Sequence, residues 1–100
     1  MAKSQTNNSR EILFREKEPG LYNVIMHNDD VTTMDFVVHI LMTIFRKSAK
    51  DAEELMLKVD REGSAVAGTY HKDIALSKRE KATREARQNG FPLMLTVEEE

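Results

Sequence analysis

The chain has 100 residues, with 15 basic and 17 acidic side chains, no cysteine and a formal charge of −2. This length fits one small domain, the charge argues against a protein that coats nucleic acid, and the lack of cysteine excludes disulfides, thiol catalysis and thiolate zinc sites. Because no apolar run approaches the roughly 18 residues that cross a bilayer, and the polar N-terminus lacks a signal-peptide core, we expect a soluble, cytoplasmic protein without a membrane partner.

Residues 1–18 form a polar segment with one apolar patch, Ile12-Leu13-Phe14, and Pro19-Gly20 follows it. This composition and the breaker predict a disordered, mobile N-terminal extension and a core domain spanning 19–100. Two interpretations of the extension stay open: an unimportant terminus, and a tether or segment that inserts into a partner.

A strand and a helix are predicted at the start of the core. Residues 21–27 are rich in β-favouring side chains and lead into the turn-forming string Asn28-Asp29-Asp30. Thr32 is predicted to begin a helix, because Asp35 completes a capping-box-like pattern and apolar residues then recur at helical spacing.

The remaining sequence predicts four more elements. A second helix runs from a cap at Ser48 to Gly63, and a strand at 64–70, a charged helix at 73–89 and a last strand at 91–97 follow it. We therefore expect an α+β domain of order β-α-α-β-α-β, in which a three-stranded antiparallel sheet carries three helices on one side.

Motifs for catalysis or cofactor binding are missing from the sequence. The glycines lack the spacing of a phosphate cradle, and the scattered histidines His27, His39 and His71 do not suggest a metal site. We expect no metal, no cofactor and no enzymatic activity. One enzymatic alternative is a small hydrolase that uses Asp29 and Asp60 as paired carboxylates, but no further motif accompanies it.

The string Asn28-Asp29-Asp30 has two interpretations. It can form a turn whose acids complement the dipole of the next helix, or its oxygens can hold an ammonium group. Met26, Met34 and Met56 suit either ordinary core packing or a hollow that adapts to varied apolar guests. A free protein N-terminus with a large apolar first residue combines both features that such a site would recognise.

Four strings carry a close resemblance to a known family: residues 22–37 (YNVIMHNDDVTTMDFV), 55–59 (LMLKV), 63–68 (GSAVAG) and 89–93 (NGFPL). They resemble ClpS, the small bacterial adaptor of the Clp AAA+ proteases. The resemblance implies binding of N-degrons, proteins that begin with Leu, Phe, Tyr or Trp, and their delivery to a ClpA- or ClpC-type unfoldase for degradation by ClpP. It also implies a monomer with no catalytic activity and no required cofactor.

The resemblance assigns roles to particular positions. Asn28 and Asp29 correspond to residues that hold the α-amino group, and Met34 to the methionine that excludes β-branched first residues. Asp73 and Lys78, on the basic third helix, resemble the surface that meets the unfoldase. The implied side-chain pocket comprises Met26, Asp30, Thr32, Met34, Val37, Met56, Val59 and Leu93.

Two positions depart from the family pattern. Thr33 stands where the family usually has a proline, which is a mild change at a first helical turn. Asp60 stands where the family usually has a histidine that helps to bind the α-amine. Three interpretations of Asp60 stay open. It can replace that histidine directly, or it can point away and pair with Arg61 or a lysine. It can also mark a subtype with altered ligand preference.

The aspartate at position 60 has two further implications. Asp29, Asp30 and Asp60 would repel one another in an empty site, so we expect the pKa of at least one of them to be raised. The same departure supports an alternative function, a regulator that binds the Clp unfoldase and has lost or altered N-degron specificity.

Overall fold

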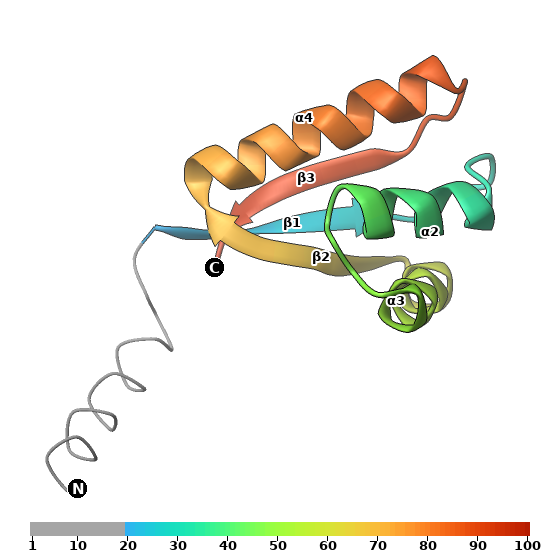
Figure 1. Cartoon of the computed structure of the whole chain (residues 1–100), viewed down its shortest axis with the longest axis horizontal. Coiled ribbons are helices and arrows are strands. Elements are labelled where there is room, and N and C mark those ends of the chain that lie inside the picture. Colours follow the sequence, from blue (N-terminus) through green and yellow to red (C-terminus); the bar gives the residue numbers. More distant parts are fainter. Residues whose placement is uncertain (1–19) are drawn as a thin grey trace, which may run out of the picture.

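A computed structural model of the chain describes residues 20–100 (Figure 1). The extension predicted at residues 1–18 lies outside the described residues, as does Pro19, so the predicted disorder and domain boundary stay predictions. The described elements are β1 (Leu21–His27), α2 (Met34–Thr43), α3 (Ala49–Glu62), β2 (Ser64–His71), α4 (Lys72–Gln88) and β3 (Met94–Glu99).

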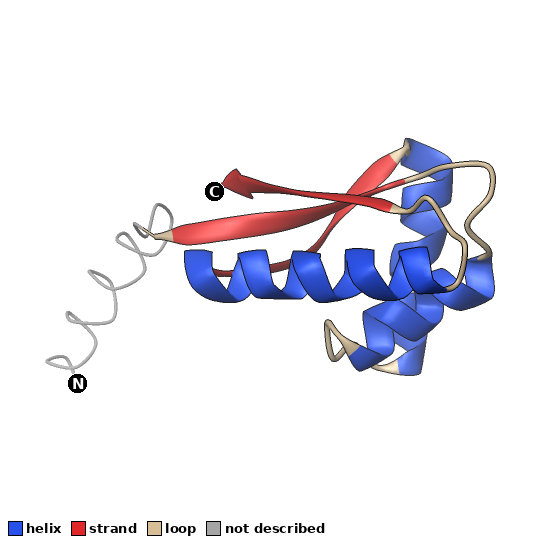
Figure 2. Ribbon diagram, turned by 90° about the horizontal axis from the view of Figure 1, so that it is seen from above, coloured by secondary structure: helices blue, strands red, loops and turns tan. Residues whose placement is uncertain are grey.

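The three strands form one sheet in the order β2-β1-β3, and both pairings are antiparallel. Together with the element order, this confirms the predicted fold class. Figure 2 shows the strands above and α4 below them, and α4 runs along one face of the sheet. Helices α2 and α3 gather at the end where β1 finishes and β2 and β3 begin (Figure 1).

The pairing of β1 with β2 contains an irregularity that the sequence pattern does not reveal. Its register shifts between Val24 and Ile25, as in a β-bulge. Along β2, Ala65 and Ala67 are buried, as alternation between the two faces of a sheet requires. After Ala67 the alternation changes by one residue, so that Tyr70, rather than Thr69, packs against the core. An uninterrupted alternation would have buried Thr69 with Ala65 and Ala67, but Thr69 is exposed.

The hydrophobic core lies between the sheet and the helices. Helix α4 contributes only small side chains to it, the fully buried Ala75, Ala82 and Ala86, so its backbone can approach the sheet closely. The larger apolar residue Ile74, near the start of the same helix, is 49% exposed. The remaining buried core residues are Val24, Met26, Phe36, Val37, Ile40, Leu41, Phe45, Ala52, Val59, Ala65, Ala67, Leu93 and Leu95.

Two predicted boundaries are corrected by the structure. The cap of α2 is Thr33, whose hydroxyl accepts the Phe36 N–H at 3.2 Å, because the Thr32 side chain binds Asp29 instead. The last strand begins at Met94, not at residue 91, and residues 91–93 form a loop that approaches β1. The predicted cap at Ser48 and the left-handed end at Gly63 are confirmed.

Among residues 20–100, none of the helices combines the length and the apolar character that a membrane crossing requires.

Candidate binding site

A hollow of about 260 Å³ opens at the end of β1, between the start of α2 and the last turns of α3. Every residue that lines it belongs to the set that the sequence singled out. The lining residues are Asn28, Asp29, Asp30, Thr32, Met34, Val37, Met56, Val59 and Asp60. Polar groups from one loop and one helix therefore meet around an apolar floor, in a space smaller than the roughly 300–1,000 Å³ of drug-sized pockets.

Asp29 organises the loop that enters α2. Its Oδ1 accepts the backbone N–H groups of Val31 at 2.8 Å and Thr32 at 2.7 Å, and its Oδ2 accepts the Thr32 hydroxyl at 2.8 Å. Because an ionised carboxylate offers about four acceptor positions, Oδ2 retains one for a ligand. Asp29 can therefore hold the loop in place and accept a hydrogen bond from a ligand at the same time.

The charge state of Asp29 follows from these contacts. Burial, the largest influence, acts to raise the pKa of its carboxyl, but the hydrogen bonds from Thr32 and Val31 and the positive charge of Arg87 outweigh it. The pKa of Asp29 therefore lies below its usual value. The expected repulsion among the acids does not raise the pKa of this residue, because three donors already stabilise its charge.

Asn28 and Asp60 reach the hollow from different elements. The Asn28 N–H donates to the Gly63 carbonyl at 2.9 Å, which ties the end of β1 to the end of α3. Asp60 lies exposed in the last turns of α3, where the helix dipole also favours a cation. Within residues 20–100 Asp60 makes no ion pair, so the structure does not support the predicted pairing with Arg61 or a lysine.

The apolar part of the site becomes more buried with depth. Val37 and Val59 are almost completely buried, while Met34 is 51% exposed at the mouth. A small recess behind them is lined by Leu93, only 1% exposed, and by His27. Leu93, the residue before β3, is therefore next to the site. His27 also lines the recess, and no pattern in the sequence indicates this position for it.

Met26 does not line the hollow. It is fully buried on the covered face of β1, opposite Leu95 and Ala65 in the neighbouring strands. It is a core residue, and its assignment to the side-chain pocket stays a prediction. The strand alternation that buries Val24 also turns Met26 into the core.

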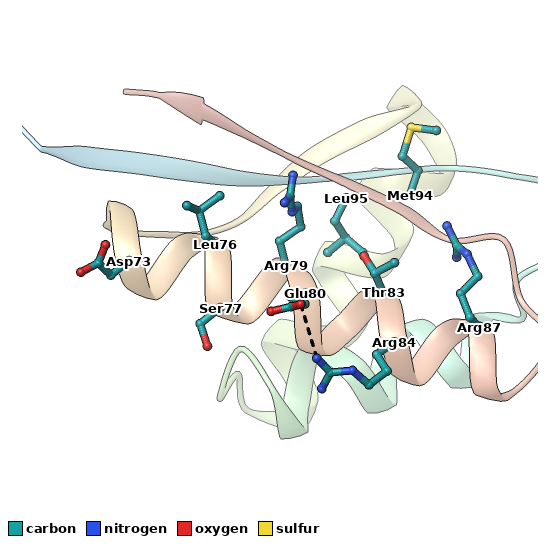
Figure 3. A pocket seen from close by; sticks show the side chains of 10 residues that line it. All are labelled: Asp73, Leu76, Ser77, Arg79, Glu80, Thr83, Arg84, Arg87, Met94 and Leu95. Atoms are coloured by element: carbon teal, nitrogen blue, oxygen red, sulfur yellow. Dashed lines mark ion pairs between the residues drawn. The ribbon is translucent and has the colours of Figure 1, made fainter.

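A larger groove, about 800 Å³, runs between α4 and β3 (Figure 3). Its polar residues come almost entirely from α4, and its apolar residues are Leu76, Met94 and Leu95. Asp73 lies at one end of it, and Arg84 contacts Glu80 at 3.5 Å, the dashed line in Figure 3. Because its charges are spread along a helix, the groove is suited to a broad protein contact and lacks a convergent small-ligand site.

Lys78 lies in a different environment from Asp73. Its Nζ donates to the Ile44 carbonyl at 2.7 Å and lies 5.2 Å from the centre of the Tyr70 ring. Burial and the nearby charges of Arg46 and Lys81 lower the pKa of Lys78. The part-buried side chain therefore caps the end of α2, a structural role that the sequence does not reveal.

Lys78→Met is expected to lower the free energy of unfolding by about 1–3 kcal/mol, because it leaves the Ile44 carbonyl without its charged donor. Urea unfolding measures the effect. The matched control is Lys81→Met, an exposed lysine on the same helix, which should change stability little. Equal effects of the two substitutions would contradict the structural role of Lys78.

In the described part of the chain, no group of three or more His, Cys, Asp and Glu side chains is placed to hold a metal ion. The hollow is instead bordered by three aspartates and an asparagine. Their oxygens are acceptors, which suit an ammonium group that brings its own N–H donors.

Comparisons with known proteins place these observations in a family. A family model described as "ATP-dependent Clp protease adaptor protein ClpS" matches residues 17–96. The ATP-dependent Clp protease adapter protein ClpS of Campylobacter jejuni is 45% identical over 100 residues, covering 100% of both chains. That of Syntrophus aciditrophicus is 52% identical over 82 residues, covering 82% of this chain and 77% of the relative.

A solved structure is also similar. Agrobacterium tumefaciens ClpS2 bound to L-phenylalaninamide matches with a TM-score of 0.79 and 41% identity, covering 83% of this chain and 100% of that one. The ligand in that structure, L-phenylalaninamide, carries an apolar side chain and a free amine.

Proposed function

The chain belongs to the ClpS family of Clp protease adaptors, and from that premise we propose that it binds N-degrons, proteins whose first residue is Leu, Phe, Tyr or Trp. One observation carries the proposal: acceptor groups of Asn28, Asp29 and Asp60 surround a hollow whose floor is apolar. A free N-terminus presents an ammonium and a side chain from a single residue, so it can satisfy both parts at once.

The α-amine is bound in this proposal by the acceptors at the rim. Asp29 Oδ2 has a free acceptor position, and Asn28 and Asp60 flank it from the ends of β1 and α3. Each charge-assisted hydrogen bond contributes about 1.5–3 kcal/mol net. Acetylation removes the charge and two donors, and it leaves the acids desolvated against a neutral amide.

The first side chain fills the apolar part. Val37, Val59 and Met56 form its walls, Leu93 closes the recess behind, and Asp30, Thr32 and the exposed Met34 form its mouth. Burying one Leu or Phe side chain contributes about 1.5–3 kcal/mol. After the cost of association, micromolar or somewhat tighter affinity is expected, which permits both capture and release.

Delivery completes the proposed function. The adaptor catalyses no reaction and hands its substrate to a ClpA- or ClpC-type unfoldase for degradation by ClpP. We propose that Asp73 and the surrounding face of α4 meet the unfoldase, and that the adaptor acts as a monomer. The N-terminal extension would serve as the tether, because a chain that enters β1 beside β3 starts close to this face.

Peptides that begin with Leu, Phe, Tyr or Trp are expected to bind with micromolar or tighter affinity in a fluorescence-anisotropy titration. The acetylated Phe peptide should lose at least about tenfold in affinity, since one charge-assisted hydrogen bond of about 1.5 kcal/mol corresponds to that factor. Peptides that begin with Val or Arg serve as matched controls. Val places a branch against Met34, and Arg places a charge in the apolar hollow.

The second candidate function is a regulator that binds the unfoldase without recognising N-degrons. The observation that favours it is Asp60, which changes the chemistry of the amine site. If a folded sample binds none of the free N-termini but does bind an unfoldase N-domain, the regulator replaces the N-degron adaptor as the explanation.

A further inference from the structure

One arginine donates two hydrogen bonds to the loop between α4 and β3. Arg87, in the last turn of α4, donates from Nη1 to the carbonyl oxygens of Phe91 at 3.0 Å and Leu93 at 2.9 Å. Figure 3 shows its side chain extending from α4 toward the start of β3. Asn89, the first residue of the loop, donates from Nδ2 back to the Glu85 carbonyl at 2.9 Å. Among the side-chain hydrogen bonds of residues 20–100, only those of Arg87 reach residues 90–93.

The two ends of the loop are held differently. Phe91 is fixed by its own N–H, which donates to the Ala86 carbonyl at 2.9 Å, and by its ring, whose centre lies 4.9 Å from that of Phe36. Pro92 has no N–H to donate. Leu93 is held at its carbonyl by Arg87 and then leads into Met94, the first residue of β3.

Leu93 is the part of this loop that enters the binding site. Its side chain is 1% exposed and lines the recess behind Val37 and Val59. A shift of the loop therefore changes the depth of the apolar part directly. Arg84 lies almost one turn earlier on α4 and is exposed. Its side chain contacts Glu80 on the surface of the same helix and makes no hydrogen bond to residues 90–93 of the loop.

We propose that Arg87 is a positioning residue of the side-chain pocket: by binding the Phe91 and Leu93 carbonyls it holds Leu93 at the depth that fits a large first side chain. This inference rests on the proposed N-degron function. A guanidinium suits the task because its donors sit on a rigid planar group, whereas a lysine presents a single rotating ammonium.

The charge of Arg87 adds a second link to the site. It lowers the pKa of Asp29, so it favours the ionised carboxylate at the amine end. The same residue thus supports both parts of the site without lining the hollow between them. Removal of Arg87 should therefore weaken binding at the side-chain end through Leu93 and raise the pKa of Asp29.

The test compares Arg87→Met with Arg84→Met, which removes the same charge from the same helix. Affinities for peptides that begin with Leu, Phe, Trp and Val are measured by anisotropy at a temperature where circular dichroism shows each variant folded. Arg87→Met should weaken binding of the Phe and Trp peptides by about 5- to 20-fold, the loss expected for two hydrogen bonds. The ratio of the affinity for these peptides to the affinity for the Val peptide should fall as well. Arg84→Met should stay within about twofold of the unmodified protein.

The ratio between peptides separates positioning from general stability, because a loss of folded protein lowers all affinities equally. If Arg87→Met does not fold, Arg87→Lys carries the test, and it should show the same loss of preference to a smaller extent. Unchanged ratios in a folded Arg87 variant overturn the inference while leaving the N-degron function intact. Failure of the unmodified protein to bind any free N-terminus overturns both.

Discussion

Asp29→Asn is expected to weaken binding of a peptide that begins with Phe by about 10- to 100-fold while the protein stays folded, because one charge-assisted hydrogen bond of about 1.5–3 kcal/mol is lost. The amide retains Oδ1, so the N–H groups of Val31 and Thr32 keep their acceptor. Its NH₂ group takes the place of Oδ2, however, and an NH₂ group cannot accept a hydrogen bond from an ammonium.

The companion variant Asp29→Ala separates the two roles of this residue. It removes the acceptors of Val31, Thr32 and the Thr32 hydroxyl together, so it should also lower the free energy of unfolding by about 1–3 kcal/mol. Urea unfolding and anisotropy on the same samples measure both effects. If Asp29→Asn binds as tightly as the unmodified protein, Asp29 is only a loop residue and the amine is held elsewhere.

The pH dependence of stability should follow the same carboxylate. Its pKa is lower in the folded protein than the ordinary value that applies to the unfolded chain. The stabilisation is therefore fully present above the unfolded pKa and is lost as the pH falls through the folded one. In Asp29→Asn this contribution disappears, so acid unfolding should depend less steeply on pH below about 4.

The residues around the hollow lie in short strings, and the resemblance carried by those strings implied most of them. Asn28 to Thr32 form one loop, and Met56, Val59 and Asp60 share one face of α3 because they are three and four residues apart. The antiparallel order of the sheet then places both at one end of the fold. The role of Thr33 as the cap was missed because Thr32 has the same side chain and lies one residue earlier.

The features that the sequence does not reveal arise where the tertiary structure decides between local alternatives. Met26 belongs to the core because the pleat of β1 aligns it with Val24, a relation that a methionine count does not reveal. Residues 91–93 have strand-like composition, but Arg87 draws their carbonyls toward α4 and delays β3 to Met94. Long side chains that reach across elements, as Arg87 and Lys78 do, leave no periodic signal in the sequence.

Asp60→His is expected to introduce an acidic limit to binding near pH 6.5, the ordinary pKa of histidine. A histidine below that pH is positively charged and repels the ammonium, whereas above it the neutral ring can accept a hydrogen bond. The unmodified protein has a carboxylate at this position and an Asp29 whose pKa lies below its usual value. Its binding should therefore persist down to about pH 5, because the ordinary pKa of an aspartate lies near 3.9 and that of Asp29 is lower still.

Anisotropy titrations from pH 5 to pH 9 compare the two proteins with Asp60→Asn, the neutral control of similar size. All three should weaken above about pH 8, because the peptide amine then loses its proton. Asp60→Asn should bind about tenfold more weakly than the unmodified protein at neutral pH, without a midpoint near 6.5. A midpoint near 6.5 in the unmodified protein would show that Asp60 is not the replacement for the family histidine.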